Sequence, residues 1–128
     1  MTQARLEHAN ITVSDPKATA EWLGNVFGWH IRWEGPGMET GYTVHVGTDD
    51  SYVALFSHGD GVPPTQDSYR TLGALNHIAA FTDDIDKVEQ RVRRAGFTPA
   101  NHNDYAPGRR FYFLDHDGIE WEVASHQS

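Results

Sequence analysis

Three side chains, His8, His77 and Glu122, have the chemistry to hold one divalent metal ion together. The chain contains no cysteine, so protein ligands for a metal must come from histidine, aspartate or glutamate. Two imidazoles and one carboxylate on one side of an ion leave its other positions open to water, oxygen or substrate, as in non-haem iron oxygenases. The residue types therefore indicate metal chemistry, provided that the fold brings the three side chains to one place.

An internal repeat offers a way to bring the two histidines together. His8 begins the segment 8–15, and His77 begins the segment 77–84, which has the same layout. Each segment leads into a stretch with helical apolar periodicity that ends at a glycine next to a phenylalanine. The histidines thus hold equivalent places in two halves, and pairing the halves about a pseudo-twofold axis would turn both imidazoles toward one cavity.

Both halves are expected to have the element order β-α-β-β-β. Asp15 before Pro16, and Asp84 in the second half, are suited to cap the first turns of two helices. Gly28 and Gly96 suit the left-handed position that ends each helix. The expected strands span residues 6–13, 29–34, 40–46 and 52–57 in the first half, and 75–81, 98–102, 109–114 and 120–124 in the second.

Alternation along the strands predicts which side chains face the cavity. Ile11 is apolar enough to pack beneath a helix, so His8 on the same strand faces the other way. In the last strand, Trp121 would face the helix, which leaves Glu122 on the side of His77. A second interpretation stays open, because a histidine in a strand is commonly a surface or hydrogen-bonded residue and Glu122 would then be a solvated charge.

Composition excludes several classes of function. A chain of 128 residues with 38% hydrophobic content can form one compact domain or two tightly paired half-domains. Its formal net charge of −8 and scattered basic residues argue against nucleic-acid binding. No apolar run reaches the roughly 20 residues that span a bilayer, and the N-terminus lacks the apolar segment of a signal peptide. We therefore expect a soluble, cytoplasmic protein with no nucleic-acid or membrane partner.

The C-terminal segment 111–123, FYFLDHDGIEWEV, resembles the YFxDPDGxxxE ending of the vicinal oxygen chelate superfamily, which includes glyoxalases, bleomycin- and fosfomycin-resistance proteins and extradiol dioxygenases. Segments 8–27 and 77–97 resemble its two module starts, so the resemblance covers nearly the whole chain. It implies an α+β fold in which two paired β-α-β-β-β modules form an open, curved sheet around a metal cavity. The expected single domain, 1–128, consists of a first module at about 4–58, a linker at about 59–70 and a second module at about 71–126.

The ligand positions of this family map onto His8, Ala54, His77 and Glu122. Ala54 cannot bind a metal. Relatives of glyoxalase I and methylmalonyl-CoA epimerase use a carboxylate or an amide there, so its loss argues against those activities. The extradiol dioxygenases and the fosfomycin-modifying enzymes use two histidines and one glutamate, as found here.

Tyr112 and His102 are the residues for which the resemblance suggests catalytic roles. Tyr112 stands ten residues before Glu122, where both branches carry a cavity tyrosine. His102 lies one residue away from the place of the extradiol acid/base histidine, and His116 replaces the signature proline. Without the resemblance, Tyr112 reads as a half-buried strand residue and His102 as a solvated loop residue.

The fosfomycin branch fits the chain less well. His102 stands where the phosphonate pocket of that branch has a lysine, and Asn10 stands where it has a threonine. Ala106 and Arg110 replace its small hydroxyl residues. Arg109 and Arg110 could bind an anion, but Arg109 could equally be an ordinary surface residue.

The tryptophans and two further histidines carry weaker signals. Trp33 and the other three tryptophans are assigned to core and sheet packing and not to a stacking surface. His45 and His58 lie on or after strands of the first half and are not expected to be ligands.

These observations favour a divalent-metal-dependent enzyme that resembles extradiol ring-cleaving dioxygenases. Its small substrate would chelate Fe(II) or Mn(II), or alternatively Zn(II) or Ni(II), through vicinal oxygens, while Tyr112 binds a chelated oxygen and His102 moves protons. Two alternatives stay open: a glyoxalase-type isomerase or lyase, and a non-catalytic ligand-binding protein of the bleomycin-resistance type. The resemblance also implies a homodimer.

Overall fold

The computed structural model describes residues 2–59, 61–106 and 108–126, and the chain divides into two compact units, Met1–Val62 and Pro63–Ser128. The expected linker, 59–70, and the loop at 104–108 each include one residue outside the described ranges. The described residues contain no helix that is long and apolar enough to cross a membrane.

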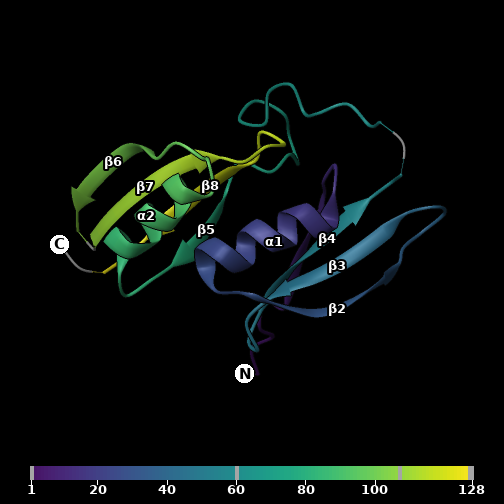
Figure 1. Ribbon diagram of the computed structural model, residues 1–128, viewed down its shortest axis with the longest axis horizontal. Coiled ribbons are helices and arrows are strands. Elements are labelled where there is room, and N and C mark those ends of the chain that lie inside the picture. The colour runs from purple at the N-terminus through teal and green to yellow at the C-terminus, as the bar shows by residue number, and fades with distance from the viewer. Residues whose placement is uncertain (1, 60, 107, 127–128) are drawn as a thin grey trace. The chain divides into compact units, whose positions relative to one another are not determined.

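Each unit carries one four-stranded mixed sheet with one helix lying against it (Figure 1). The strand orders are β1-β4-β3-β2 and β5-β8-β7-β6, and the first and last strands of each unit pair in parallel. The predicted β-α-β-β-β order and the α+β class are thus confirmed. The first unit contains β1 (His8–Thr12), α1 (Pro16–Phe27), β2 (His30–Pro36), β3 (Tyr42–Gly47) and β4 (Tyr52–Ser57), and the second contains β5 (Ile78–Phe81), α2 (Ile85–Arg94), β6 (Ala100–Tyr105), β7 (Gly108–Leu114) and β8 (Glu120–Ala124).

Both helices begin and end where the capping residues predict. The Asp15 carboxylate accepts hydrogen bonds from the backbone N–H groups of Lys17 and Ala18, each at 3.2 Å, and Gly28 ends α1 at φ 72°. The Asp84 carboxylate caps α2 by accepting from the backbone N–H of Lys87 at 3.1 Å, and Gly96 follows the last turn at φ 97°. These ends fix where the flanking strands can start.

The core of each unit lies between its helix and one face of its sheet. Alternate residues of the strands supply the buried side chains, which leaves the opposite face of each sheet for other uses. The buried residues on the two helix-facing sides are Val44, Val46, Val53 and Leu55 in the first unit, and Phe111, Phe113, Trp121 and Val123 in the second.

Trp33 departs from the packing role expected of the tryptophans. Trp22 and Trp121 are buried, whereas Trp33, on the edge strand β2, keeps 51% of its surface exposed. A β-bulge in β2 is the reason, since it interrupts the alternation between Ile31 and Trp33.

Asp115 holds together the turn between β7 and β8. One carboxylate oxygen accepts the backbone N–H groups of Asp117 and Ile119 at 2.9 and 3.0 Å, and the other accepts the indole N–H of Trp121 at 3.0 Å. Because β8 carries Glu122, this turn sets the register at which that residue faces β7.

Replacing Asp115 with alanine is expected to lower the free energy of unfolding by about 2–3 kcal/mol, since it leaves the buried indole N–H of Trp121 without this acceptor. Urea titration followed by tryptophan fluorescence measures the change. The exposed Asp83 is the matched control, and Asp83→Ala is expected to shift stability by less than about 0.5 kcal/mol. Equal effects of the two substitutions would contradict the role assigned to Asp115.

Candidate metal centre

His77 and Glu122 meet on the face of the second sheet that is turned away from α2. His77 Nε2 lies 3.1 Å from Glu122 Oε1. Parallel pairing of Ile78 with Trp121 brings the start of β5 beside β8, and Glu122 is only 5% exposed there. Two ligands at a right angle, each about 2.1 Å from a metal, stand about 3 Å apart. The two donor atoms are therefore separated as neighbouring ligands of one ion would be.

Arg110 and Tyr112 surround the same carboxylate from β7. Arg110 Nη1 donates to Glu122 Oε2 at 2.9 Å, and Tyr112 is the direct cross-strand neighbour of Glu122. The Tyr112 ring stands edge-on to the His77 ring, with the ring centroids 5.8 Å apart. We call His77, Arg110, Tyr112 and Glu122 the His77 cluster.

The phenol of Tyr112 is held in its protonated form. Burial, the negative charge of Glu122 and a hydrogen bond to Glu122 raise the pKa of Tyr112 above its usual value. Tyr112 can therefore donate a hydrogen bond or a proton from this position at neutral pH.

Two polar atoms of the His77 cluster lack a hydrogen-bond partner in the described part of the chain. They are His77 Nδ1 and Arg110 Nε, and both are buried. Native proteins leave few such atoms, because each costs about 1–3 kcal/mol. Unsatisfied buried atoms destabilise a purely structural contact, and their presence is more typical of a functional site.

His8 lies in the first unit, on the face of its sheet turned away from α1. Its Nδ1 lies 2.9 Å from Glu7 Oε1, and its ring stacks on Tyr52 at 4.9 Å between centroids. The hydrogen bonds from His8 and Tyr52 lower the pKa of Glu7. Histidines that bind metals usually donate one ring N–H to a carboxylate, which orients the other nitrogen. Glu7 fills that role for His8 and leaves Nε2 for a ligand.

The residues present fit a divalent ion in type. His77 and Glu122 supply one imidazole and one carboxylate within a single unit, and His8 has the carboxylate partner typical of a metal-binding histidine. Within the described residues, no three histidine, aspartate or glutamate side chains converge on one point. The three-ligand site therefore stays a proposal.

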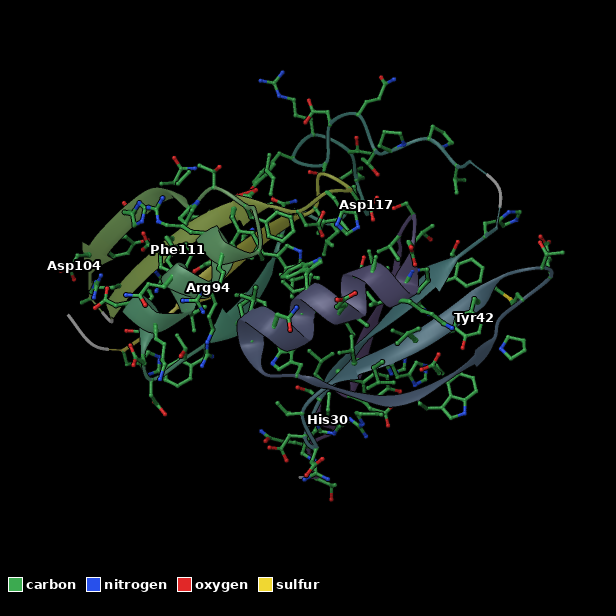
Figure 2. The ribbon with its side chains drawn as sticks, viewed as in Figure 1. His30, Tyr42, Arg94, Asp104, Phe111 and Asp117 are labelled. Atoms are coloured by element: carbon green, nitrogen blue, oxygen red, sulfur yellow. The ribbon has the colours of Figure 1, made fainter. Side chains whose placement is uncertain are left out.

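The structure does not bring His102 to the His77 cluster. His102 Nε2 lies 3.0 Å from Glu89 Oε1 on α2, and its ring stacks on Phe111 at 5.7 Å. A bulge between Ala100 and Asn103 shifts the alternation of β6 and turns His102 to the helix side. There it lines a hollow of about 140 Å³ with Phe111 and Asp104, both labelled in Figure 2. In this structure the side chain of His102 contacts α2, and the acid/base role expected of it stays a prediction.

Sequence reasoning missed Glu7 and gave Arg110 no definite role. Glu7 is adjacent to the predicted ligand His8, which was the available signal. Arg110 shares a strand face with Tyr112, two residues away, so alternation alone places it toward Glu122. Arg109 faces the other way and pairs with Asp86 of α2 at 2.8 Å, on the side of the sheet away from Glu122.

The comparisons with known proteins agree with this architecture. The family model of the Glyoxalase/Bleomycin resistance protein/Dioxygenase superfamily matches residues 5–123. No curated protein sequence matches the chain.

Three solved structures illustrate the likeness, which at these identities is one of fold. A glyoxylase/bleomycin resistance protein/dioxygenase domain from Frankia sp. EAN1pec is 22% identical, with a TM-score of 0.81 and 97% of this chain and 93% of that chain covered. FosX from Listeria monocytogenes, complexed with Mn(II) and 1S,2S-dihydroxypropylphosphonic acid, is 20% identical, with a TM-score of 0.74 and coverage of 97% and 93%. TioX from Micromonospora sp. ML1 is 20% identical, with a TM-score of 0.68 and coverage of 96% and 99%.

Proposed function

Because the chain belongs to the glyoxalase/bleomycin resistance protein/dioxygenase superfamily, we propose that it is an enzyme whose divalent ion is held by His8, His77 and Glu122. The observation that carries the proposal is the 3.1 Å approach of His77 Nε2 to Glu122 Oε1. The contact of His8 with Glu7 supports the third ligand. Fe(II) and Mn(II) are the favoured ions, and Zn(II) or Ni(II) would accept the same ligands. Mn(II) in the FosX structure is consistent with this choice.

The proposed substrate is a small molecule that offers two adjacent oxygen atoms to the ion. The bound ion would act as a Lewis acid that lowers the proton affinity of those oxygens. Arg110 holds the second oxygen of Glu122, and this contact fixes the direction in which the carboxylate presents its other oxygen. Tyr112 carries a proton beside Glu122 and would donate a hydrogen bond to a substrate oxygen.

We propose O₂-dependent ring cleavage of an aromatic diol as the first reaction to test. A polarographic oxygen electrode measures O₂ consumption by Fe(II)- or Mn(II)-loaded protein with catechols. Consumption that requires both metal and diol supports this reaction, whereas no consumption by any loaded form contradicts it.

A metal-assisted isomerase or lyase is the second candidate. The observation that favours it is the position of His102 against Glu89, because ring cleavage then lacks the histidine acid/base suggested by the family resemblance. Such a reaction proceeds without O₂, so turnover of a vicinal-oxygen substrate under anaerobic conditions separates the two. A non-catalytic binding protein would bind such a ligand and release it unchanged.

Tyr112→Phe is expected to lower kcat by about 100-fold while leaving the metal content unchanged, because it removes a proton donor but no ligand. Steady-state kinetics beside elemental analysis of the same samples measures both quantities. Tyr42→Phe, on β3 of the first unit, is the matched control, because its hydroxyl contacts Glu34 and it does not belong to the His77 cluster. An unchanged kcat in the Tyr112 variant would remove Tyr112 from the mechanism.

We also propose that the protein forms a homodimer, as the family resemblance implies. Sedimentation equilibrium of the metal-loaded protein tests this directly. A mass of about 14.4 kDa would mean a monomer and would contradict the proposal.

A further inference from the structure

Aromatic and imidazole rings gather on the face of the first sheet that is turned away from α1. His45 stacks on Tyr52 with the ring centroids 4.7 Å apart. The Trp33 ring is tilted against the His45 ring, with the centroids 5.1 Å apart. His8 stacks on the same Tyr52 at 4.9 Å. The rings come from four strands, so they form a surface that spans the whole sheet.

The bulge in β2 adds a cation to this surface. Ile31 pairs with Val46 and Trp33 pairs with His45, so Arg32 is the extra residue between them. Regular alternation would send Arg32 and Trp33 to opposite faces, but the guanidinium carbon of Arg32 lies 4.4 Å from the centroid of Tyr52. Bulges are frequent beside functional sites because they re-aim side chains in this way. We call Arg32, Trp33, His45 and Tyr52 the ring surface.

Trp33 and Arg32 both keep solvent-exposed side chains. Trp33 retains 51% of its surface, and Arg32 is also exposed. Arg32 donates to the Thr48 carbonyl oxygen at 3.2 Å, and no carboxylate of the described residues forms an ion pair with it. Besides the hydrogen bond from His8, the charge of Arg32 helps to lower the pKa of the Glu7 carboxylate, but Arg32 and Glu7 form no direct ion pair. A large indole and a guanidinium on one strand therefore offer a flat apolar contact and N–H donors for an anion.

We propose that the ring surface binds a planar aromatic acid, with the ring on Trp33 and His45 and the carboxylate on Arg32. This assignment rests on the proposed function and narrows its substrate class. The link is His8, a proposed metal ligand, whose ring stacks on Tyr52 of the ring surface. The substrate class is then an aromatic acid with adjacent ring oxygens. Stacking supplies the affinity for the ring, and the charge-assisted hydrogen bonds of Arg32 select the acid.

The test uses the metal-free full-length protein and three probes. Benzoate has both the ring and the charge, benzyl alcohol has the ring alone, and cyclohexanecarboxylate has the charge alone. Titrations are followed by the indole N–H signal of Trp33 in proton–nitrogen correlation spectra, assigned by its loss in Trp33→Leu. We expect benzoate to shift this signal and to bind about tenfold more tightly than either other probe.

Two substitutions separate the contributions of the ring and the charge. Arg32→Gln is expected to weaken benzoate binding about tenfold and to leave benzyl alcohol binding unchanged, whereas Trp33→Leu is expected to weaken both. Because Trp33→Leu lacks the Trp33 indole signal, its titrations are followed by the backbone amide signals of His45 and Tyr52, calibrated against the same signals in the wild type. Arg70→Gln, with a side chain that is 87% exposed, is the charge-matched control and is expected to bind benzoate as the wild type does. Correlation spectra of each variant confirm that the fold is retained.

The inference is overturned if benzoate leaves the Trp33 signal unchanged, or if Arg32→Gln binds benzoate as tightly as the wild type. Either result, in a protein that still binds a divalent ion, would refute the proposal that the ring surface binds an aromatic acid and would leave the proposed metal site standing. Benzoate binding as expected in a protein that binds no divalent ion would refute the metal site alone. The two proposals therefore fail in distinguishable ways.

Discussion

Glu122→Gln is expected to lower the affinity for Mn(II) by on the order of 100-fold or more, because an amide replaces the one proposed anionic ligand. The substitution keeps the size of the side chain and an oxygen that can accept from Arg110, so the fold is expected to persist. Isothermal titration of metal-free protein with Mn(II) under anaerobic conditions measures the affinity.

Glu120→Gln is the matched control for this experiment. Glu120 lies two residues earlier on β8 and accepts a hydrogen bond from the hydroxyl of Tyr69, with no contact to His77 among the described residues. Its substitution is expected to change Mn(II) affinity by less than about threefold, because the half-buried Glu120 is not a proposed ligand and acts only as a nearby charge. Equal losses in the two variants would indicate a general effect of charge on the strand and would contradict ligation by Glu122.

Arg110→Met is expected to lower the free energy of unfolding of the metal-free protein by about 3 kcal/mol, because it leaves the buried carboxylate of Glu122 without this cation. Mn(II) is expected to offset much of this loss, since the ion would supply positive charge to the same carboxylate. Saturation at about 100 times the dissociation constant contributes about 2.7 kcal/mol. Urea titrations with and without Mn(II) measure both effects.

Arg109→Met provides the comparison, because Arg109 precedes Arg110 on β7 but pairs with the exposed Asp86. Such pairs contribute about 0–1 kcal/mol to the free energy of unfolding, and Mn(II) is not expected to offset the loss of one. A metal-independent loss in Arg110→Met would show that Arg110 is a structural cation and has no link to a metal on Glu122.

Local sequence patterns predicted the elements of this fold well because their physical causes are local. Asp15 before Pro16 satisfies the first N–H groups of a helix, and Gly28 takes the left-handed conformation that ends it. Strict alternation then places Glu122 and Tyr112 on the face opposite the core. Strands without irregularities thus allowed this part of the candidate site to be predicted.

Bulges explain the two main departures from the sequence-based predictions. In β6 the register shifts after Ala100, where Asn101 takes φ 55°, and His102 turns toward α2. In β2 the extra residue Arg32 brings Trp33 to the ring surface. Alternation assumes a period of two residues, and a single inserted residue reverses every assignment beyond it. No glycine or proline marks either bulge, so the sequence carried no signal for them.

Side-chain contacts between different strands and helices could not be predicted from the sequence either. The contact of Arg110 with Glu122 depends on the register of β7 against β8, which the Asp115 turn sets. The contact of His102 with Glu89 depends on how α2 lies against its sheet. Such contacts follow from tertiary packing and not from local preference.

The metal content of His8→Ala and His77→Ala beside the wild type tests the three-ligand site, because the two substitutions remove one proposed ligand from each unit. Untagged proteins are reconstituted anaerobically with Fe(II) or Mn(II), desalted and analysed by elemental mass spectrometry. We expect near-stoichiometric metal in the wild type and a loss of most of it in both variants. A wild type that retains no metal, or a His8→Ala variant that retains as much as the wild type, would contradict the three-ligand site.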